Sequence, residues 1–194
     1  FSHEVERRAA RIPFTMQSRA GLMTPSAVAA LASAGCEEVW LGVESGSQKI
    51  LDAMDKGTSL DEIGDATSRL KEHGIRACWF IQLGYSGEDW DDLVATRDLI
   101  RAERPDDVGV SVAYPLPGTK FYDRVQAELS VKANWSDSDD LAMMFRGTYT
   151  TDFYRQIRDL LHQEVTALAQ AHPMPEWPFD APWDELEDRE AEHP

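Results

Sequence analysis

Short apolar runs alternate with longer amphipathic segments along residues 12–114, and this alternation restricts the possible folds more than any other feature. The apolar runs recur at a pitch of about 35 residues, which is the spacing that repeated β–α units produce. Segments that open at cap residues such as Thr24 and Ser59 and close at Gly35 and Gly74 are predicted to be helices. The predicted strands are residues 12–17, 38–43, 75–83 and 108–114. The pattern predicts an α/β fold with a parallel sheet of four strands, covered on both faces because runs such as 77–81 are almost wholly apolar.

The repeat stops after Thr119, and a different architecture is expected beyond it. We divide the chain into a β–α region at residues 1–128, a helical extension at 129–172 and an acidic, proline-containing tail at 173–194. The extension contains one long amphipathic helix with an apolar stripe. The tail is predicted to be disordered unless Trp177 and Trp183 dock against the rest of the chain.

Charge and hydropathy limit the classes of partner. The 35 acidic and 19 basic residues give a formal net charge of −16, which would repel nucleic acid and an anionic membrane surface. No apolar run reaches the roughly 18 residues of a membrane-spanning helix, and the N-terminal residues lack the apolar stretch of a signal peptide. We therefore expect a cytoplasmic protein that binds neither nucleic acid nor membrane.

The cysteines and histidines do not indicate a metal site in this chain. Cys36 and Cys78 are too few for a disulfide framework and lack the short spacing of metal ligands, so we predict that both are buried in or beside strands. The five histidines lie on predicted helices or in the tail without ligand spacing, which disfavours a zinc site.

Polar residues cluster just after the predicted strands. In a barrel-like parallel sheet these positions converge on one mouth, whereas chance would scatter polar residues among both ends of the strands. The residues that share this placement are Arg19, Glu44, Ser45, Lys56, Gln82, Glu88, Tyr114 and Pro115. The sequence therefore predicts a ligand site at the carboxyl edge of the sheet.

Glu44 stands at the end of an apolar strand between glycines that allow a ligand to approach the backbone. Its carboxylate can accept two hydrogen bonds from ribose hydroxyls; the alternative is that it only favours the start of the short helix that follows. Lys56 could neutralise a ligand carboxylate or could be an ordinary surface lysine. Pairing of Glu44 with Glu88 as acid and base is less favoured, because Glu88 has an adequate role at a helix start.

Phe80 and Gln82 lie on one face of the third predicted strand, because side chains alternate along a strand. Gln82 is polar where an apolar residue is expected, so its amide either bonds neighbouring strands or faces a ligand. After the fourth strand, Tyr114 and Pro115 begin a stiff loop with two prolines, which exposes carbonyl groups.

Three motifs resemble the later half of a radical S-adenosylmethionine (SAM) core. They are Gly-Val-Glu-Ser-Gly-Ser at 42–47 followed by Lys-Gly at 56–57, Gly-x-x-Gly-Glu at 84–88, and Tyr-Pro-Leu-Pro-Gly-Thr at 114–119. Together with the segment around 139–145, they are similar to the subgroup with a cobalamin-binding N-terminal domain, which includes anaerobic Mg-protoporphyrin monomethyl ester cyclases. The resemblance implies a partial (β/α) barrel of six strands, of which this chain would hold the last four.

The resemblance also implies cofactors and residue roles. Glu44, with Ser45 beside it, would contact the ribose of SAM, and Arg19 and Lys56 its methionine carboxylate. A wall beside the adenosine would consist of Phe80 and Gln82, and the backbone of Tyr114 and Pro115 would contact adenine. The family's 4Fe–4S cluster donates an electron to SAM and yields a 5′-deoxyadenosyl radical that abstracts hydrogen from a substrate.

The family's CxxxCxxC loop matches nothing in this sequence, so we expect the cluster ligands and any cobalamin domain outside this chain. The chain alone would then be inactive, its parent would take electrons from ferredoxin or flavodoxin for a small-molecule substrate, and the open edge at residues 12–17 would invite self-association. Two alternatives stay open: a non-catalytic interaction module, and a TIM-barrel hydrolase or lyase that uses Glu44.

Overall fold

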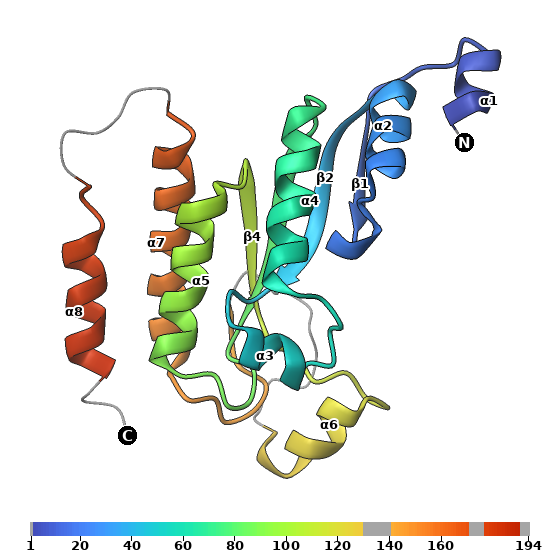
Figure 1. Cartoon of the computed structure of the whole chain (residues 1–194). Coiled ribbons are helices and arrows are strands. Elements are labelled where there is room, and N and C mark those ends of the chain that lie inside the picture. The colour runs from blue at the N-terminus through green and yellow to red at the C-terminus, as the bar shows by residue number, and fades with distance from the viewer. Residues whose placement is uncertain (1, 130–140, 171–176, 191–194) are drawn as a thin grey trace.

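The computed structural model describes residues 2–129, 141–170 and 177–190. Its centre is one parallel sheet in which the strands follow one another in chain order, β1-β2-β3-β4 (Figure 1). The strands are β1 (Phe14–Ser18), β2 (Cys36–Glu44), β3 (Arg76–Leu83) and β4 (Asp107–Val112). The predicted α/β class with four parallel strands is confirmed.

Four helices pack on one face of the sheet: α2 (Pro25–Ala34), α4 (Leu60–Glu72), α5 (Trp90–Glu103) and α7 (Thr151–Leu168). Their starts follow from local chemistry. Ser59 accepts a hydrogen bond from the Glu62 amide while the Glu62 side chain accepts one from the Ser59 amide, which closes a capping box on α4. Asp89 and Asp92 form the same reciprocal pair on α5. Within the described ranges, no helix is long and apolar enough to span a membrane.

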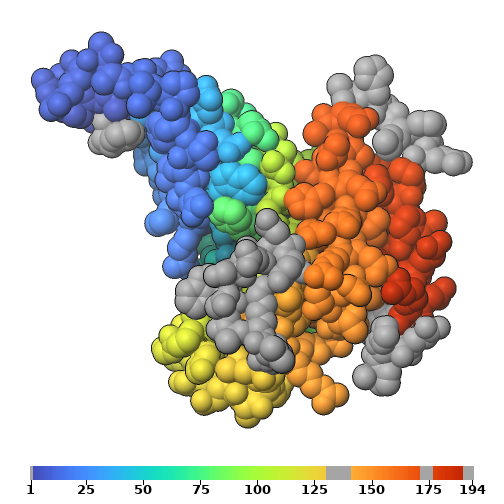
Figure 2. Space-filling model, turned by 180° about the vertical axis from the view of Figure 1, so that it is seen from behind, coloured from blue at the N-terminus to red at the C-terminus, as the bar shows by residue number. Residues whose placement is uncertain are grey.

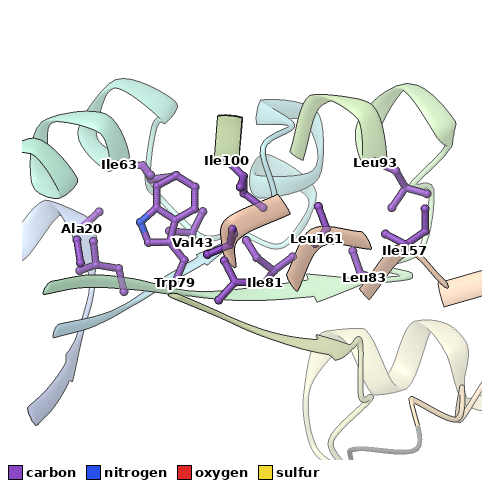
Figure 3. Packing of buried hydrophobic residues seen from close by; sticks show 14 of the residues in the cluster. Ala20, Val43, Ile63, Trp79, Ile81, Leu83, Leu93, Ile100, Ile157 and Leu161 are labelled. Carbon is purple, nitrogen blue, oxygen red and sulfur yellow. The ribbon is translucent and has the colours of Figure 1, made fainter. Parts of the chain in front are cut away.

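The core lies between the sheet and these helices. Alternate residues of β3, including Trp79 and Ile81, are at most 1% exposed and point toward the helix layer (Figure 3). The opposite face differs from the expectation of cover on both sides, because Trp40, Phe80 and Gln82 there are only half-buried. Figure 2 shows strand atoms of this face between the N-terminal segment and α7. We call it the inner face of the sheet.

Short elements close the carboxyl edge of the sheet. They are η1 (Ala20–Leu22), α3 (Gln48–Ala53), α6 (Lys120–Val125) and η2 (Gln126–Glu128). An aromatic cluster packs α6 against the loop after β3: Tyr85 stacks on Phe121 with ring centroids 4.6 Å apart, and Phe121 meets Phe145 edge-on at 5.4 Å. The Tyr85 hydroxyl donates to the Ala53 carbonyl at 3.0 Å, so the loops that carry the predicted site rest on a packed base.

The two ends of the chain add helices that the sequence pattern did not predict. At the N-terminus, α1 (Ser2–Arg7) lies next to α2. At the C-terminus, α8 (Asp180–Glu190) lies beside α7 (Figure 1). Trp183 of α8 is 1% exposed, and its indole donates to the buried Glu164 carboxylate at 2.5 Å. The sequence predicted a disordered tail unless Trp177 and Trp183 dock; Trp183 is docked, and residues 180–190 form a helix. The polar stretch 134–140 lies outside the described residues.

Candidate functional site

Three predicted site residues from three separate segments meet at the carboxyl edge. The Lys56 ammonium lies 2.6 Å from Oε1 of Glu44, and the Arg19 guanidinium donates to the Lys56 carbonyl. The side chains of Lys56 and Glu44 are 22% and 19% exposed, so a ligand in solvent can reach both. We call these residues the Arg19–Glu44–Lys56 cluster. It places the Glu44 carboxylate beside the Lys56 ammonium, with the Arg19 guanidinium on the Lys56 carbonyl.

The backbone conformation at Glu44 determines where its carboxylate points. The β2–β3 register shifts between Gly42 and Glu44, and Glu44 has φ +69°, in the left-handed region. A Cβ at Gly42 would lie 3.0 Å from both the Glu44 carboxylate and the Lys56 ammonium. The ion pair therefore extends over Gly42 on the inner face, and a larger residue at that position would crowd it.

An aromatic pair lies beside the cluster on the inner face. Phe80 is the register partner of Gly42 and stacks on Trp40 with ring centroids 4.9 Å apart. A Cβ at Gly109 would lie 3.3 Å from both rings, so the glycine lets the rings lie close to β4. Gln82 is half-buried on the same face, opposite Ser111 in the register. Sequence reasoning missed Trp40, although its alternation with Gly42 and Glu44 was visible.

Ser45 is separated from the cluster. It is fully buried, and its Oγ lies 3.4 Å from Oγ1 of Thr96 on α5. Its placement therefore does not support direct ligand contact. Tyr114 and Pro115 follow β4 at the same carboxyl edge, but β3 stands between them and β2. Pro115 is buried and Tyr114 is half-buried against the core.

Glu88 is also buried away from the cluster. It is 1% exposed, its Oε2 accepts the Gly84 amide at 2.6 Å, and burial raises the pKa of its carboxyl to about 8. The cap of α5 is Asp89 instead. An acid–base pair with Glu44 is not supported, because the Glu88 side chain serves the turn at Gly84.

The residues present fit a nucleoside ligand better than a metal cluster. In the part of the chain that the structure describes, no group of three or more His, Cys, Asp or Glu side chains could hold a metal ion. Cys36 and Cys78 are both buried, and burial raises the pKa of the Cys78 thiol to about 12, so it stays protonated. The Arg19–Glu44–Lys56 cluster, in contrast, offers acceptors for hydroxyls and donors for a carboxylate. Those are the polar groups that SAM carries.

An open parallel sheet of four strands with helices on one face defines a partial (β/α) barrel, and its charged cluster lies at the carboxyl edge, where proteins of that class bind ligands. The sequence matches the Radical SAM superfamily over residues 2–100, and the chain belongs to that superfamily.

Curated relatives share part of the chain. A Methanocaldococcus jannaschii protein with the provisional name of methylthiotransferase is 39% identical over 45% of this chain and 19% of its own length. An uncharacterised methyltransferase of Pyrococcus horikoshii is 27% identical over 69% of this chain and 29% of its own. The bacteriochlorophyllide d C-12(1)-methyltransferase of Chlorobaculum tepidum is 26% identical over 64% and 27%. The chain thus spans less than a third of each of these relatives.

Solved structures support the fold. Methylornithine synthase superposes with a TM-score of 0.58 at 14% identity, over 82% of this chain and 41% of that one. The archaeal Elp3 of Methanocaldococcus infernus gives 0.56 at 20% identity, over 86% and 34%. The radical SAM methyltransferase TsrM from Kitasatospora setae, with cobalamin and a 4Fe–4S cluster bound, gives 0.53 at 22% identity, over 59% and 23%. These identities establish a shared fold only.

Proposed function

We propose that this chain forms the SAM-binding part of a radical SAM enzyme and that the Arg19–Glu44–Lys56 cluster holds the cofactor. One observation carries the proposal. The cluster places a carboxylate 2.6 Å from an ammonium group at the carboxyl edge of a radical SAM sheet, with both side chains open to solvent. A ligand that carries both hydroxyls and a carboxylate matches this arrangement.

Each member of the cluster has a distinct task in this proposal. Lys56 engages Oε1 of Glu44, and the carboxylate offers its second oxygen to a ribose hydroxyl. The ammonium group has three donors, so Lys56 can bond Glu44 and a ligand carboxylate together. Arg19, which donates to the Lys56 carbonyl, holds the lysine turn and adds positive charge for the same carboxylate.

The adenosine would lie along the inner face. Phe80, stacked on Trp40, supplies a flat apolar wall, and Gln82 supplies an amide on the same face. The backbone of Tyr114 and Pro115, which follow β4, would contact adenine from the β4 end of the sheet. These contacts would orient the nucleoside and exclude water from it.

The remaining cofactors would belong to other parts of the enzyme. SAM bound here would supply the adenosyl group for reductive cleavage at a 4Fe–4S cluster. The described residues contain no group of three or more His, Cys, Asp or Glu side chains that could hold a metal ion. The ligands of the 4Fe–4S cluster would therefore lie outside the described residues. A cobalamin-dependent methyl transfer to a small molecule, with ferredoxin or flavodoxin as reductant, is our proposal for the whole enzyme. The similarity to a bacteriochlorophyllide methyltransferase supports methyl transfer to a small molecule.

Of the two alternatives, membership of the Radical SAM superfamily leaves no support for an ordinary TIM-barrel hydrolase. The non-catalytic interaction module predicts that the protein has no affinity for SAM. SAM binding therefore separates that alternative from our proposal.

The test is SAM affinity of the complete gene product, purified without oxygen and measured by isothermal titration calorimetry. Glu44→Gln should weaken binding about tenfold, because a hydrogen bond to a charged group contributes about 1.5–3 kcal/mol. Glu72→Gln is the control: Glu72 is exposed at the end of α4 and belongs to no part of the proposed site. Equal affinity of the two variants would contradict the proposal.

A further inference from the structure

The segment 45–47, which joins β2 to α3, is bound to α5. The Gly46 amide donates to Oγ1 of Thr96 at 2.9 Å, and the Ser45 hydroxyl lies 3.4 Å from the same atom. Thr96 in turn donates to the carbonyl of Asp92 at 3.0 Å, one turn earlier in α5. Because its proton is directed into the helix, its oxygen is oriented to accept the Gly46 amide.

Asp92 provides a second anchor. The Ser47 hydroxyl donates to its Oδ1 at 2.6 Å, and the Lys49 ammonium lies 2.6 Å from its Oδ2. Asp92 is 6% exposed, and its Oδ2 also accepts the Asp89 amide at 3.0 Å in the capping box. This carboxylate therefore joins the start of α5 to the segment that follows Glu44.

The backbone of the segment 45–47 also lies close to the backbone of α5. A Cβ at Gly46 would lie 2.4 Å from the Ala95 carbonyl oxygen and 2.5 Å from Cα of Thr96. Real Cβ atoms do not approach backbone so closely, so only glycine allows the segment to lie on this turn of α5. Side-chain and main-chain contacts thus fix the position of the same three residues.

Glu44 is adjacent to this anchor and has a strained backbone. The Ser45 amide donates to the Val43 carbonyl at 2.9 Å, and the intervening Glu44 has φ +69°. These are features of a γ-turn centred on Glu44, a conformation that is rare and costly for a residue other than glycine. Such strain persists only where the surroundings over-determine it. The bonds to α5 are the surroundings that do so here.

We propose that Thr96 and Asp92 are positioning residues, which hold Glu44 in this turn so that its carboxylate faces the ligand. The inference rests on the proposed function, because it assumes that Glu44 contacts SAM. Neither residue touches the cluster itself. Their effect on SAM would be transmitted through Ser45, Gly46 and Ser47.

The test uses Thr96→Val in the complete gene product, because valine keeps the shape and removes the hydroxyl that accepts the Gly46 amide and donates to the Asp92 carbonyl. We expect the dissociation constant for SAM to rise about tenfold, the effect of leaving a buried amide without its partner. Hydrogen exchange at the Gly46 amide should become faster in the same variant. Thr96→Ser restores the hydroxyl and should bind SAM within about twofold of the natural protein.

Thr67→Val is the matched control for stability. Thr67 is also a buried helical threonine that donates to the carbonyl one turn earlier, at 2.9 Å, and it accepts the Trp79 indole at 3.1 Å. It should lower stability without weakening SAM binding. If Thr96→Val binds SAM as Thr67→Val does while Glu44→Gln binds weakly, the positioning role is overturned and the proposed function stands. If Glu44→Gln has no effect, the proposed function fails. Unchanged exchange at Gly46 in Thr96→Val would overturn the positioning role in either case.

Discussion

The Lys56 ammonium lies 2.6 Å from the Glu44 carboxylate, although Glu44 ends strand β2 and Lys56 lies in the turn after α3. The short helix α3 and the turn at Gly57, with φ +60°, return the chain to the end of β2 and place the lysine there. The pair presents an acceptor and donors side by side, which a ligand that carries both hydroxyls and a carboxylate can engage together.

Lys56→Met should weaken SAM binding about tenfold, because it removes the cation and keeps the apolar stem. Lys71→Met is the control: this lysine donates to the Glu103 carbonyl at 3.2 Å, far from the carboxyl edge, and its loss should leave SAM affinity unchanged. Titration calorimetry of both variants measures the difference. Natural affinity in Lys56→Met would remove the lysine from the site.

Gly46→Ala should release the segment 45–47 from α5. The added Cβ would lie 2.4 Å from the Ala95 carbonyl oxygen, so the segment must move, and we expect a loss of about 2 kcal/mol in the free energy of unfolding. Gly21→Ala is the matched control, because its Cβ would meet nothing closer than 3.5 Å. Urea denaturation compares the two. A tolerated alanine at position 46 would contradict the packing described above.

Glu88 should make stability fall as pH rises. Burial raises the pKa of its carboxyl from 4.5 to about 8, so the unfolded chain releases the proton at a lower pH than the native state does. Its contribution to stability is complete below pH 4.5 and is lost as pH rises to about 8. Glu88→Gln should remove this dependence, because glutamine does not titrate between these pH values.

Urea unfolding at several pH values between those limits gives the slope for each variant. Glu72→Gln, at an exposed position on α4, should keep the slope of the natural protein. If Glu88→Gln keeps it as well, Glu88 is ionised in the native state near neutral pH, against this account.

Arg101→Met should destabilise the C-terminal part of the core, where α5 contacts α7 and α8. Arg101 donates to both oxygens of the fully buried Glu164 at 2.6 and 3.0 Å, and its removal leaves that carboxylate without its cation. A loss of about 3 kcal/mol is expected, with a change in Trp183 fluorescence. Arg155→Met, which removes an exposed pair with Asp152, should cost less than about 1 kcal/mol. Similar losses for the two would contradict the buried network.

The sheet could be predicted because its cause is local. Alternation of apolar runs with capped helices determines where each strand begins, and Glu44 and Lys56 follow from their places at strand and turn ends. The orientation of the Ser45 side chain toward α5 could not be predicted in this way. It depends on a register shift at Gly42 and on Thr96, which lies on a helix about fifty residues away.

The structure of the C-terminal tail could not be predicted from local sequence either. Its prolines and acidic residues favour disorder, and tertiary contacts such as the one between Trp183 and the buried Glu164 outweigh them. Glu88 resembles a helix cap in sequence, yet the turn at Gly84 buries it and Asp89 takes the cap. Contacts between distant segments decided the positions of Ser45 and the tail, and the turn at Gly84 decided that of Glu88.

The most direct measurement of the central claim compares S-adenosylhomocysteine with its 2′-deoxy analogue, bound to the natural protein and to Glu44→Gln. If Glu44 accepts a ribose hydroxyl, the natural protein should prefer the ribose form by about tenfold, and Glu44→Gln should lose most of that preference. An equal preference in both proteins would show that Glu44 does not contact the ribose and would contradict the account.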